Sequence, residues 1–140
     1  MYKTGAVSAA TGVSAAKLSR WQDRKTLKPS RQDKASSGSG DHRLFSRVTI
    51  DRIAIAKRLT DLGIAARPAN QAAASFVEPY KFGRTLLVVK PSGGSQILNA
   101  EFNATLTDIC GRPFESAAIV DIGQIILAVD HALISNLKDT

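Results

Sequence analysis

The sequence has one cysteine, Cys110, and two histidines, so no internal disulfide can form and no set of ligands has the spacing of a zinc site. No apolar run approaches the roughly 20 residues that a membrane-spanning helix needs. The first residues lack the apolar core of a signal peptide, and no basic stretch carries a bulky apolar face suited to a membrane surface. These absences predict a cytoplasmic protein that needs no metal and no cofactor.

Groups for catalysis are also scarce. His42 falls in a polar loop, where a solvated side chain is expected, and His131 falls on a helical stretch near the C-terminus. Cys110 is expected to be a small buried apolar residue, with a redox sensor as the alternative. The Ser-Gly-Gly turn at residues 92–94 lacks the lysine and hydroxyl residue of a phosphate-binding loop. Without a nucleophile and base, a metal set or such a loop, we expect no enzymatic activity.

Positive charge, by contrast, is abundant in one half of the chain. Residues 1–67 hold fourteen Lys and Arg against five Asp, a net charge of +9, whereas residues 68–140 hold five cationic and seven acidic residues, a net charge of −2. The 44% of apolar residues is enough for a packed core. The asymmetry predicts a polyanionic partner for the first half only.

Residues 4–31 contain two short helical patterns that meet at a Gly-Val-Ser turn. Gly12 permits the left-handed backbone of a tight turn, and Ser14 can cap the second helix. Leu18 and Trp21 share the face that we expect to be buried, with base stacking as the alternative for Trp21. This pattern predicts a helix-turn-helix with its recognition helix over residues 14–24; a helical hairpin with a solvated basic face is the alternative. The outward face carries Lys17, Arg20 and Arg24.

A wing is predicted after this helix. Residues 26–29 are expected to be extended, because a proline disfavours helical backbone in the residue before it. Residues 30–42 are polar and rich in Gly and Ser, as flexible loops are, and residues 43–46 return as a short strand. The two strands and their loop, the wing over residues 30–45, would bring three cations to DNA phosphates or a minor groove, namely Arg31, Lys34 and Arg43.

The rest of the chain alternates helix and strand patterns. Ser46 can cap a helix over residues 47–62 that has Asp51 on its polar side and Leu62 on its apolar side, and Gly63 ends it. Residues 102–112 are ambiguous. The other elements expected are a helix over 68–78, a hairpin of 84–90 with 95–101, a strand over 114–121 and a final helix over 123–137.

The final helix has a long apolar side, and Asp130 and Lys138 lie away from it. This side packs on the hairpin of its own chain, or part of it pairs with the same helix of a second chain, because a lone hairpin needs further cover. Either way we expect a small dimer module. The apolar side consists of Ile122, Ile125, Ile126, Val129, Ala132, Leu133 and Leu137.

Five short motifs follow one another in the first half. They are Gly-Val-Ser (12–14), Leu18 with Trp21, Pro-Ser-Arg (29–31), Arg-Leu-Phe-Ser (43–46) and Leu-Gly-Ile (62–64). In this order and spacing, residues 2–64 resemble the DNA-binding domain of the mercury-resistance-regulator (MerR) family of winged helix-turn-helix transcription regulators.

The chain departs from that family in and after the recognition helix. The family's usual Arg falls on Ser19, its Tyr on Arg20, the Gly after the helix on Lys25 and the next Leu on Thr26. The long coiled coil of the family's dimers and a cluster of metal-sensing cysteines are missing from the sequence.

The fold class expected is α+β, with a winged helix-turn-helix domain over residues 1–67 and a module of helix, hairpin and C-terminal helix over residues 68–140. The resemblance implies a nucleoid-associated, homodimeric regulator of transcription that binds specific sites on double-stranded DNA, with RNA polymerase or a recombinase as a further partner. The alternative is an excisionase-like architectural factor that assists a recombinase. A third hypothesis is an adaptor whose basic half binds an acidic protein.

The recognition helix is expected to read bases and the wing to grip the backbone. Arg20 is the residue expected to contact guanine in bidentate fashion, whereas Ser14 is more a cap than a base contact. Arg43 is either a phosphate contact or a structural strut of the wing. Affinity should fall steeply with salt, because several phosphates are neutralised. The DNA-binding residues expected are Ser14, Lys17, Ser19, Arg20, Arg24, Lys28, Arg31, Lys34 and Arg43.

Overall fold

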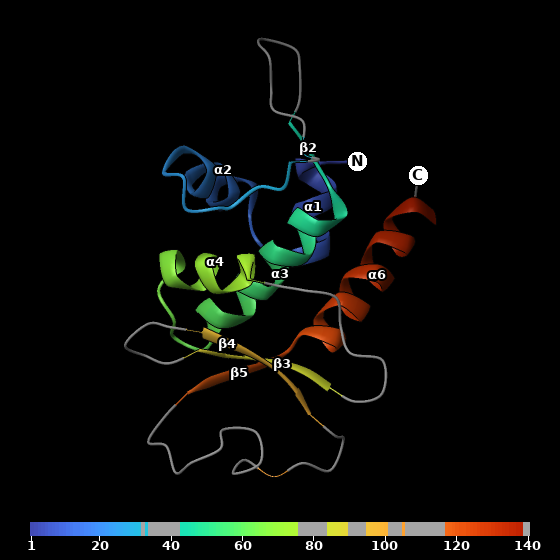
Figure 1. Ribbon diagram of the computed structural model, residues 1–140. Coiled ribbons are helices and arrows are strands. Elements are labelled where there is room, and N and C mark those ends of the chain that lie inside the picture. The colour runs from blue at the N-terminus through green and yellow to red at the C-terminus, as the bar shows by residue number, and fades with distance from the viewer. Residues whose placement is uncertain are drawn as a thin grey trace.

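The computed structural model describes residues 1–31, 33, 43–75, 84–89, 95–100, 105 and 117–138. Over these residues the chain mixes helix and strand, and a helical domain of the helix-turn-helix type comes first. In Figure 1 the helices of the first half lie above a three-stranded sheet, and α6 rises beside them. None of the described helices combines the length and the apolar character that crossing a membrane requires.

The helix-turn-helix forms as its local signals predict. Gly12 has a φ of +77°, and its N–H donates to the carbonyl of Ser8 at 2.9 Å. The Ser14 hydroxyl accepts a hydrogen bond from the N–H of Lys17 at 3.2 Å, which confirms the predicted cap. Val7, Leu18 and Trp21 are buried. The elements of the first half are β1 (Tyr2–Lys3), α1 (Thr4–Thr11), α2 (Ala15–Asp23), β2 (Leu44–Phe45), α3 (Arg47–Asp61) and α4 (Ala66–Ala74).

Helix α3 is the centre of the molecule. Its predicted start is confirmed, because the Ser46 hydroxyl accepts from the N–H of Thr49. Its predicted stop is confirmed as well, since Gly63 follows the last turn with a φ of +97°. Two side chains differ from the prediction: Leu62 is 57% exposed, and Asp51 is buried. Leu62 is exposed because it is the C-cap residue, where the chain leaves the helix.

The expected pairing of the wing strands is wrong. Residues 26–29 form no strand, and β2 pairs instead with β1, antiparallel, with Tyr2 opposite Phe45. The reason lies at the end of α2, where the N–H groups of Thr26 and Leu27 both donate to the carbonyl of Trp21, at 2.8 and 3.1 Å. Those donors are used by the helix end, and Pro29 has none.

The second half supplies one antiparallel sheet and a long helix. β3 (Arg84–Val89) is the central strand, with β4 (Ser95–Ala100) on one edge and β5 (Ala118–Asp121) on the other. The predicted hairpin is thereby confirmed, with Val89 opposite Ser95. α6 (Ile122–Lys138) follows β5 directly. The expectations for residues 76–80, 91–94, 106–112 and 114–116, including Cys110, lie outside the described residues, and so does His42.

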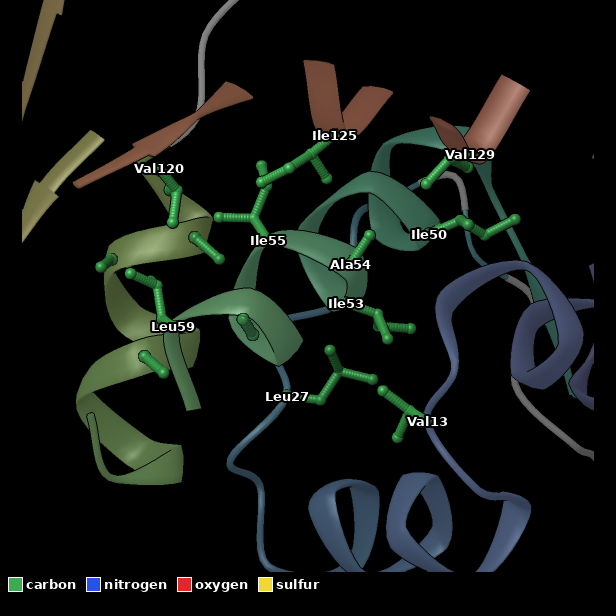
Figure 2. Packing of buried hydrophobic residues seen from close by; sticks show 14 of the residues in the cluster. Val13, Leu27, Ile50, Ile53, Ala54, Ile55, Leu59, Val120, Ile125 and Val129 are labelled. Carbon is green, nitrogen blue, oxygen red and sulfur yellow. The ribbon is translucent and has the colours of Figure 1, made fainter. Parts of the chain in front are cut away.

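The buried apolar residues of both halves form one cluster. In Figure 2, Val120 and Ile125 face Ile55, and Val129 lies near Ile50. Helix α6 packs against α1 and α3 as well as against β3. The predicted packing of its apolar side within its own chain is therefore confirmed, and the sequence pattern missed that α1 and α3 are the larger part of the packing surface.

Helix α4 begins earlier than expected. It starts at Ala66, two residues before Pro68, so the proline lies in the first turn, where its missing N–H leaves no hydrogen bond unmade. The described helix ends at Ala74. Ala69, Ala72 and Ala73 are buried against α3, which brings the two helices close together.

Candidate nucleic-acid interface

Helix α2 presents a polar face to solvent because two large apolar residues hold its other face. Leu18 is fully buried and Trp21 is 5% exposed, so Trp21 belongs to the core. Three predicted contact residues of this helix, Ser14, Ser19 and Arg20, are exposed. With Leu18 and Trp21 fixed, the polar face cannot rotate inward without opening the core.

Lys17 and Arg24 complete the predicted face of α2. Arg24 is the C-cap residue and is exposed. Lys17 is half-buried, and its ammonium nitrogen lies 5.7 Å from the centre of the Trp21 ring. This distance is within the range of a cation–π interaction, which holds the Lys17 side chain against the surface of the helix.

The end of α2 has an unusual backbone. Lys25 has a φ of +55°, the left-handed region, and its N–H donates to the carbonyl of Gln22 at 3.1 Å. The N–H of Thr26 donates to the carbonyl of Trp21 at 2.8 Å. These two bonds make a Schellman motif, in which the left-handed position is most often glycine.

The chain after α2 is tied to α3 at several points. The guanidinium of Arg52 donates from Nη1 to the carbonyl of Lys28 at 3.1 Å, and the N–H of Ser30 donates to the Thr49 hydroxyl at 3.0 Å. The side chains of Lys28 and Arg31 are exposed. The predicted cations of this segment therefore lie on a backbone that α3 holds in place.

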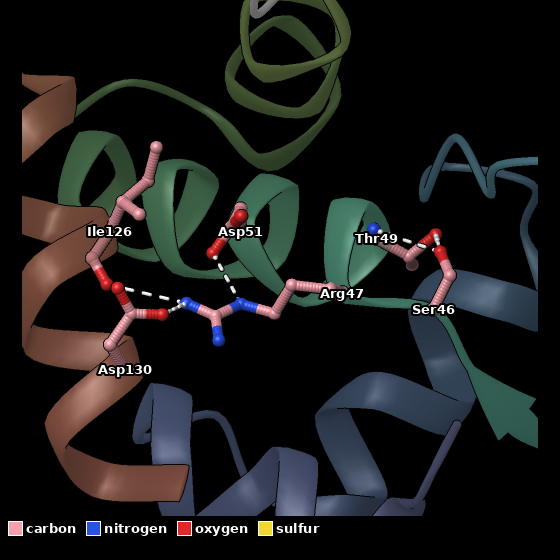
Figure 3. Close-up of polar contacts among 6 residues, drawn as sticks. All are labelled: Ser46, Arg47, Thr49, Asp51, Ile126 and Asp130. Carbon is pink, nitrogen blue, oxygen red and sulfur yellow. Dashed lines mark hydrogen bonds and ion pairs between the residues drawn. The ribbon is translucent and has the colours of Figure 1, made fainter. Parts of the chain in front are cut away.

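Asp33 forms the strongest of these ties. Its carboxylate accepts from the N–H of Ser46 at 2.8 Å and from the hydroxyl of Thr49 at 2.8 and 2.7 Å. Ser46 and Thr49 are themselves buried, and Figure 3 shows them side by side at the start of α3. A carboxylate at a helix N-terminus is favoured by the partial positive charge there. Since the first turn of α3 holds no acidic residue of its own, Asp33 supplies the anion.

A cleft lies between the end of α2 and β2. Its volume is about 460 Å³. Three cations of the described chain line it, Lys25 and Lys28 on one side and Arg43 on the other, together with an apolar wall to which Leu27 and Phe45 contribute. Arg43 is half-buried. The described lining therefore combines three cations with apolar residues.

Arg47 joins the start of α3 to α6 (Figure 3). Its guanidinium forms ion pairs with Asp51, at 3.1 Å, and with Asp130 of α6, and it donates to the carbonyl of Ile126 at 3.3 Å. Burial opposes the charge of Arg47, but attraction and hydrogen bonds from both carboxylates raise its pKa above the usual value. Asp130, expected to lie away from the packing side, thus makes the polar link at its edge.

Burial raises the pKa of Asp51 above its ordinary value, although Arg47 lies beside it and favours the charged form. The side chain of Asp51 is 9% exposed, so loss of hydration outweighs the attraction of one half-exposed guanidinium. No group of three or more His, Cys, Asp or Glu side chains is gathered anywhere in the described residues.

The structure brings some of the predicted contact residues together and leaves others apart. Lys28 and Arg43 meet at the cleft, whereas Ser19 and Arg20 lie on the open face of α2. Lys34 is outside the described residues. Sequence reasoning missed four residues that build this region, and only Lys25, which stands at the family's glycine position, had a signal that could have pointed to it. The four are Lys25, Asp33, Thr49 and Arg52.

Comparison with known proteins assigns the family. No curated protein matches the chain. A family model described as MerR HTH family regulatory protein matches residues 2–71, half of the chain, and spans β1 to α4 with the whole of α2 and its cleft. The chain therefore belongs to the MerR family of helix-turn-helix regulatory proteins, whose domain serves DNA-binding regulation of transcription.

Proposed function

We propose that this chain is a cytoplasmic, nucleoid-associated regulator of transcription that binds specific sites on double-stranded DNA. The observation that carries the proposal is the orientation of α2: its apolar face is buried, and Ser19, Arg20 and Arg24 face solvent. Residues 14–24 would enter the major groove. Arg20, exposed in the last turns of the helix, would make a bidentate contact to guanine.

The second part of the proposal concerns the flanking backbone. Residues 30–45 would follow the phosphates beside the groove, with Arg31 and Lys34 as contacts. Arg31 is exposed, and the segment before it is tied to α3 through Arg52 and Thr49. A held backbone loses less freedom on binding than a free one, which favours affinity.

We further propose that the protein acts as a homodimer, with residues 1–67 as the DNA-binding domain and residues 68–140 as the module that pairs. Leu127 and Ile134, seven residues apart on α6, are about half exposed, with His131 between them on the same open face. A two-fold dimer would bind two half-sites about one DNA turn apart. Light scattering that gives only monomer at high micromolar concentration would contradict pairing and leave the DNA-binding proposal intact.

The experiment that tests the function is selection of bound genomic fragments, followed by titration of the selected duplex. We expect Arg20→Ala to reduce the preference for the selected site over random duplex by about 1–3 kcal/mol. Arg58→Ala is the matched control, because Arg58 is an exposed cation at the far end of α3.

Three results would change the proposal. If Arg20→Ala has no effect while Lys34→Ala lowers the specific affinity, base recognition is assigned to the wrong residue. Footprints on clustered direct repeats near an attachment site would favour the architectural role with a recombinase, whereas one palindromic operator would favour a regulator of transcription. Failure to bind any duplex at low salt would leave the adaptor hypothesis.

A further inference from the structure

Lys25 occupies a backbone conformation that glycine adopts more readily. It is the single non-glycine residue with positive φ among the described residues. The molecule offers an internal comparison, because α3 ends in the same Schellman motif: the N–H of Gly63 donates to Thr60 and that of Ile64 to Leu59. There the left-handed position is glycine, with a φ of +97°. A lysine at the equivalent position of α2 is disfavoured by its Cβ, so its side chain calls for an explanation.

The Lys25 side chain lines the cleft of about 460 Å³ at the end of α2. Lys28 and Arg43 line it too, so three cations from two separate parts of the chain surround one space. Among the described residues of the lining, Asp33 is the one acidic side chain, and both of its oxygens already accept hydrogen bonds from the start of α3. The cleft therefore keeps an excess of positive charge.

The walls of the cleft are held before any ligand arrives. Arg52 holds the carbonyl of Lys28, and Thr49 holds the N–H of Ser30. Gln22, in the same wall, has a buried Nε2 with no hydrogen-bond acceptor in the described part of the chain. A buried donor without an acceptor costs free energy of desolvation. If the Gln22 side chain rotates, an acceptor bound in the cleft would give this nitrogen a hydrogen-bond partner.

We propose that Lys25, Lys28 and Arg43 form a pocket for one phosphate of the DNA backbone, next to the bases that α2 reads. Pro29, the exposed apolar residue of the lining, then contacts the deoxyribose beside that phosphate. A phosphate in the cleft would accept charge-assisted hydrogen bonds from all three cations, two of which, Lys25 and Lys28, are open to solvent. This proposal rests on the proposed function, and it makes Lys25 a binding residue that the chain retains against its backbone preference.

The test compares Lys25→Gly, Lys25→Arg and the control Arg58→Ala on one random-sequence duplex, over a range of salt concentrations. Lys25→Gly is expected to weaken binding about threefold to tenfold at 0.1 M salt and to make the slope of log K against log salt less negative by about 0.9, the value for one lost phosphate contact. Lys25→Arg keeps the charge and is expected to bind as the wild type does. Arg58→Ala removes an equal charge elsewhere and should leave the slope unchanged.

The same variants are then heated. Because glycine suits the left-handed position, Lys25→Gly is expected to unfold at the wild-type temperature or up to about 4 °C above it, so weaker binding cannot come from misfolding. Wild-type affinity and slope in Lys25→Gly would overturn the proposal, and so would a loss in Lys25→Arg equal to that in Lys25→Gly. A lower unfolding temperature for Lys25→Gly would overturn the claim of an unfavourable backbone. If the wild type binds no duplex, the proposed function itself fails, which is a separate result.

Discussion

The two ends of α3 are built in opposite ways. At its start, polar side chains make the contacts: Asp33 binds Ser46 and Thr49, and Arg47 binds Asp51 and Asp130. At its end, backbone hydrogen bonds make the contacts: Gly63 and Ile64 close a Schellman motif, and Leu62 is left exposed. The ion pair there, between Lys57 and Asp61, joins neighbouring turns of the same helix.

The difference shows where the molecule is held together across long sequence separations. The tie to the segment after α2 and the tie to α6 both start from the first turn of α3, and the first of them lies beside the proposed DNA interface. In the described part of the chain, the hydrogen bonds and the ion pair at the end of α3 are local and worth little at an exposed position, and the charge of Lys17 adds a weak attraction to Asp61. Substitutions at the start should therefore act far more strongly than matched substitutions at the end.

The largest effect is expected for Arg47→Met. The change leaves Asp51 buried without a cation and removes the link to Asp130, so the free energy of unfolding should fall by about 3–5 kcal/mol. Arg58→Met, the matched change near the other end of α3, should stay within about 0.5 kcal/mol of the wild type. Urea denaturation measures both, and equal losses in the two variants would remove the contrast between the ends.

A smaller effect is expected for Thr49→Val. Valine keeps the shape of the side chain but removes the hydroxyl that donates to Asp33 and accepts from Ser30, so stability should fall by about 1–3 kcal/mol. Thr60→Val is the control, because its hydroxyl donates only to the carbonyl of Lys57, one turn back. A loss for Thr60→Val as large as that for Thr49→Val would argue that position along α3 does not matter.

The smallest effect is expected for Asp51→Asn. Because the folded state raises the pKa of Asp51, it holds the Asp51 proton more tightly than the unfolded chain does. The stabilisation from this group is present below the unfolded pKa, near 4, and is lost as pH rises through the raised folded value. In Asp51→Asn, that part of the pH profile should become flatter. The free energy of unfolding at pH 7 should change by less than about 1 kcal/mol, because Arg47 still forms its ion pair with Asp130. Denaturation between pH 4 and 7 tests the sign; a loss as large as that of Arg47→Met would show that the charged Asp51 stabilises the fold.

The parts of the fold that the sequence predicts are those with local causes. The caps at Ser14 and Ser46 and the left-handed glycines at 12 and 63 depend on neighbours within a few residues. The hairpin of β3 and β4 depends on one apolar, β-branched run and on a second segment that follows it closely in the chain. Each of these expectations is confirmed without reference to the rest of the chain.

The parts that the sequence does not predict depend on residues far apart. Residues 26–29 were expected to pair with β2, but β1 pairs with it instead. The N–H groups of Thr26 and Leu27 are not free to pair with a strand, because they donate to the carbonyl of Trp21 at the end of α2. Arg47 reaches α6 only once α6 has packed on α3. In the candidate site, helical spacing correctly placed Arg20 and Arg24 in solvent, and the one sign of the left-handed backbone at Lys25 was that the family's glycine falls on this position.

The burial of Trp21 has a practical consequence. It is the one tryptophan of the sequence, it lies in α2, and it is almost wholly enclosed. Its fluorescence emission therefore responds when α2 detaches from the body of the molecule. A shift of that emission to longer wavelength at a lower urea concentration than the loss of helical circular dichroism would show that this helix separates first. The protein thus has an intrinsic optical probe in the helix on which its proposed function depends.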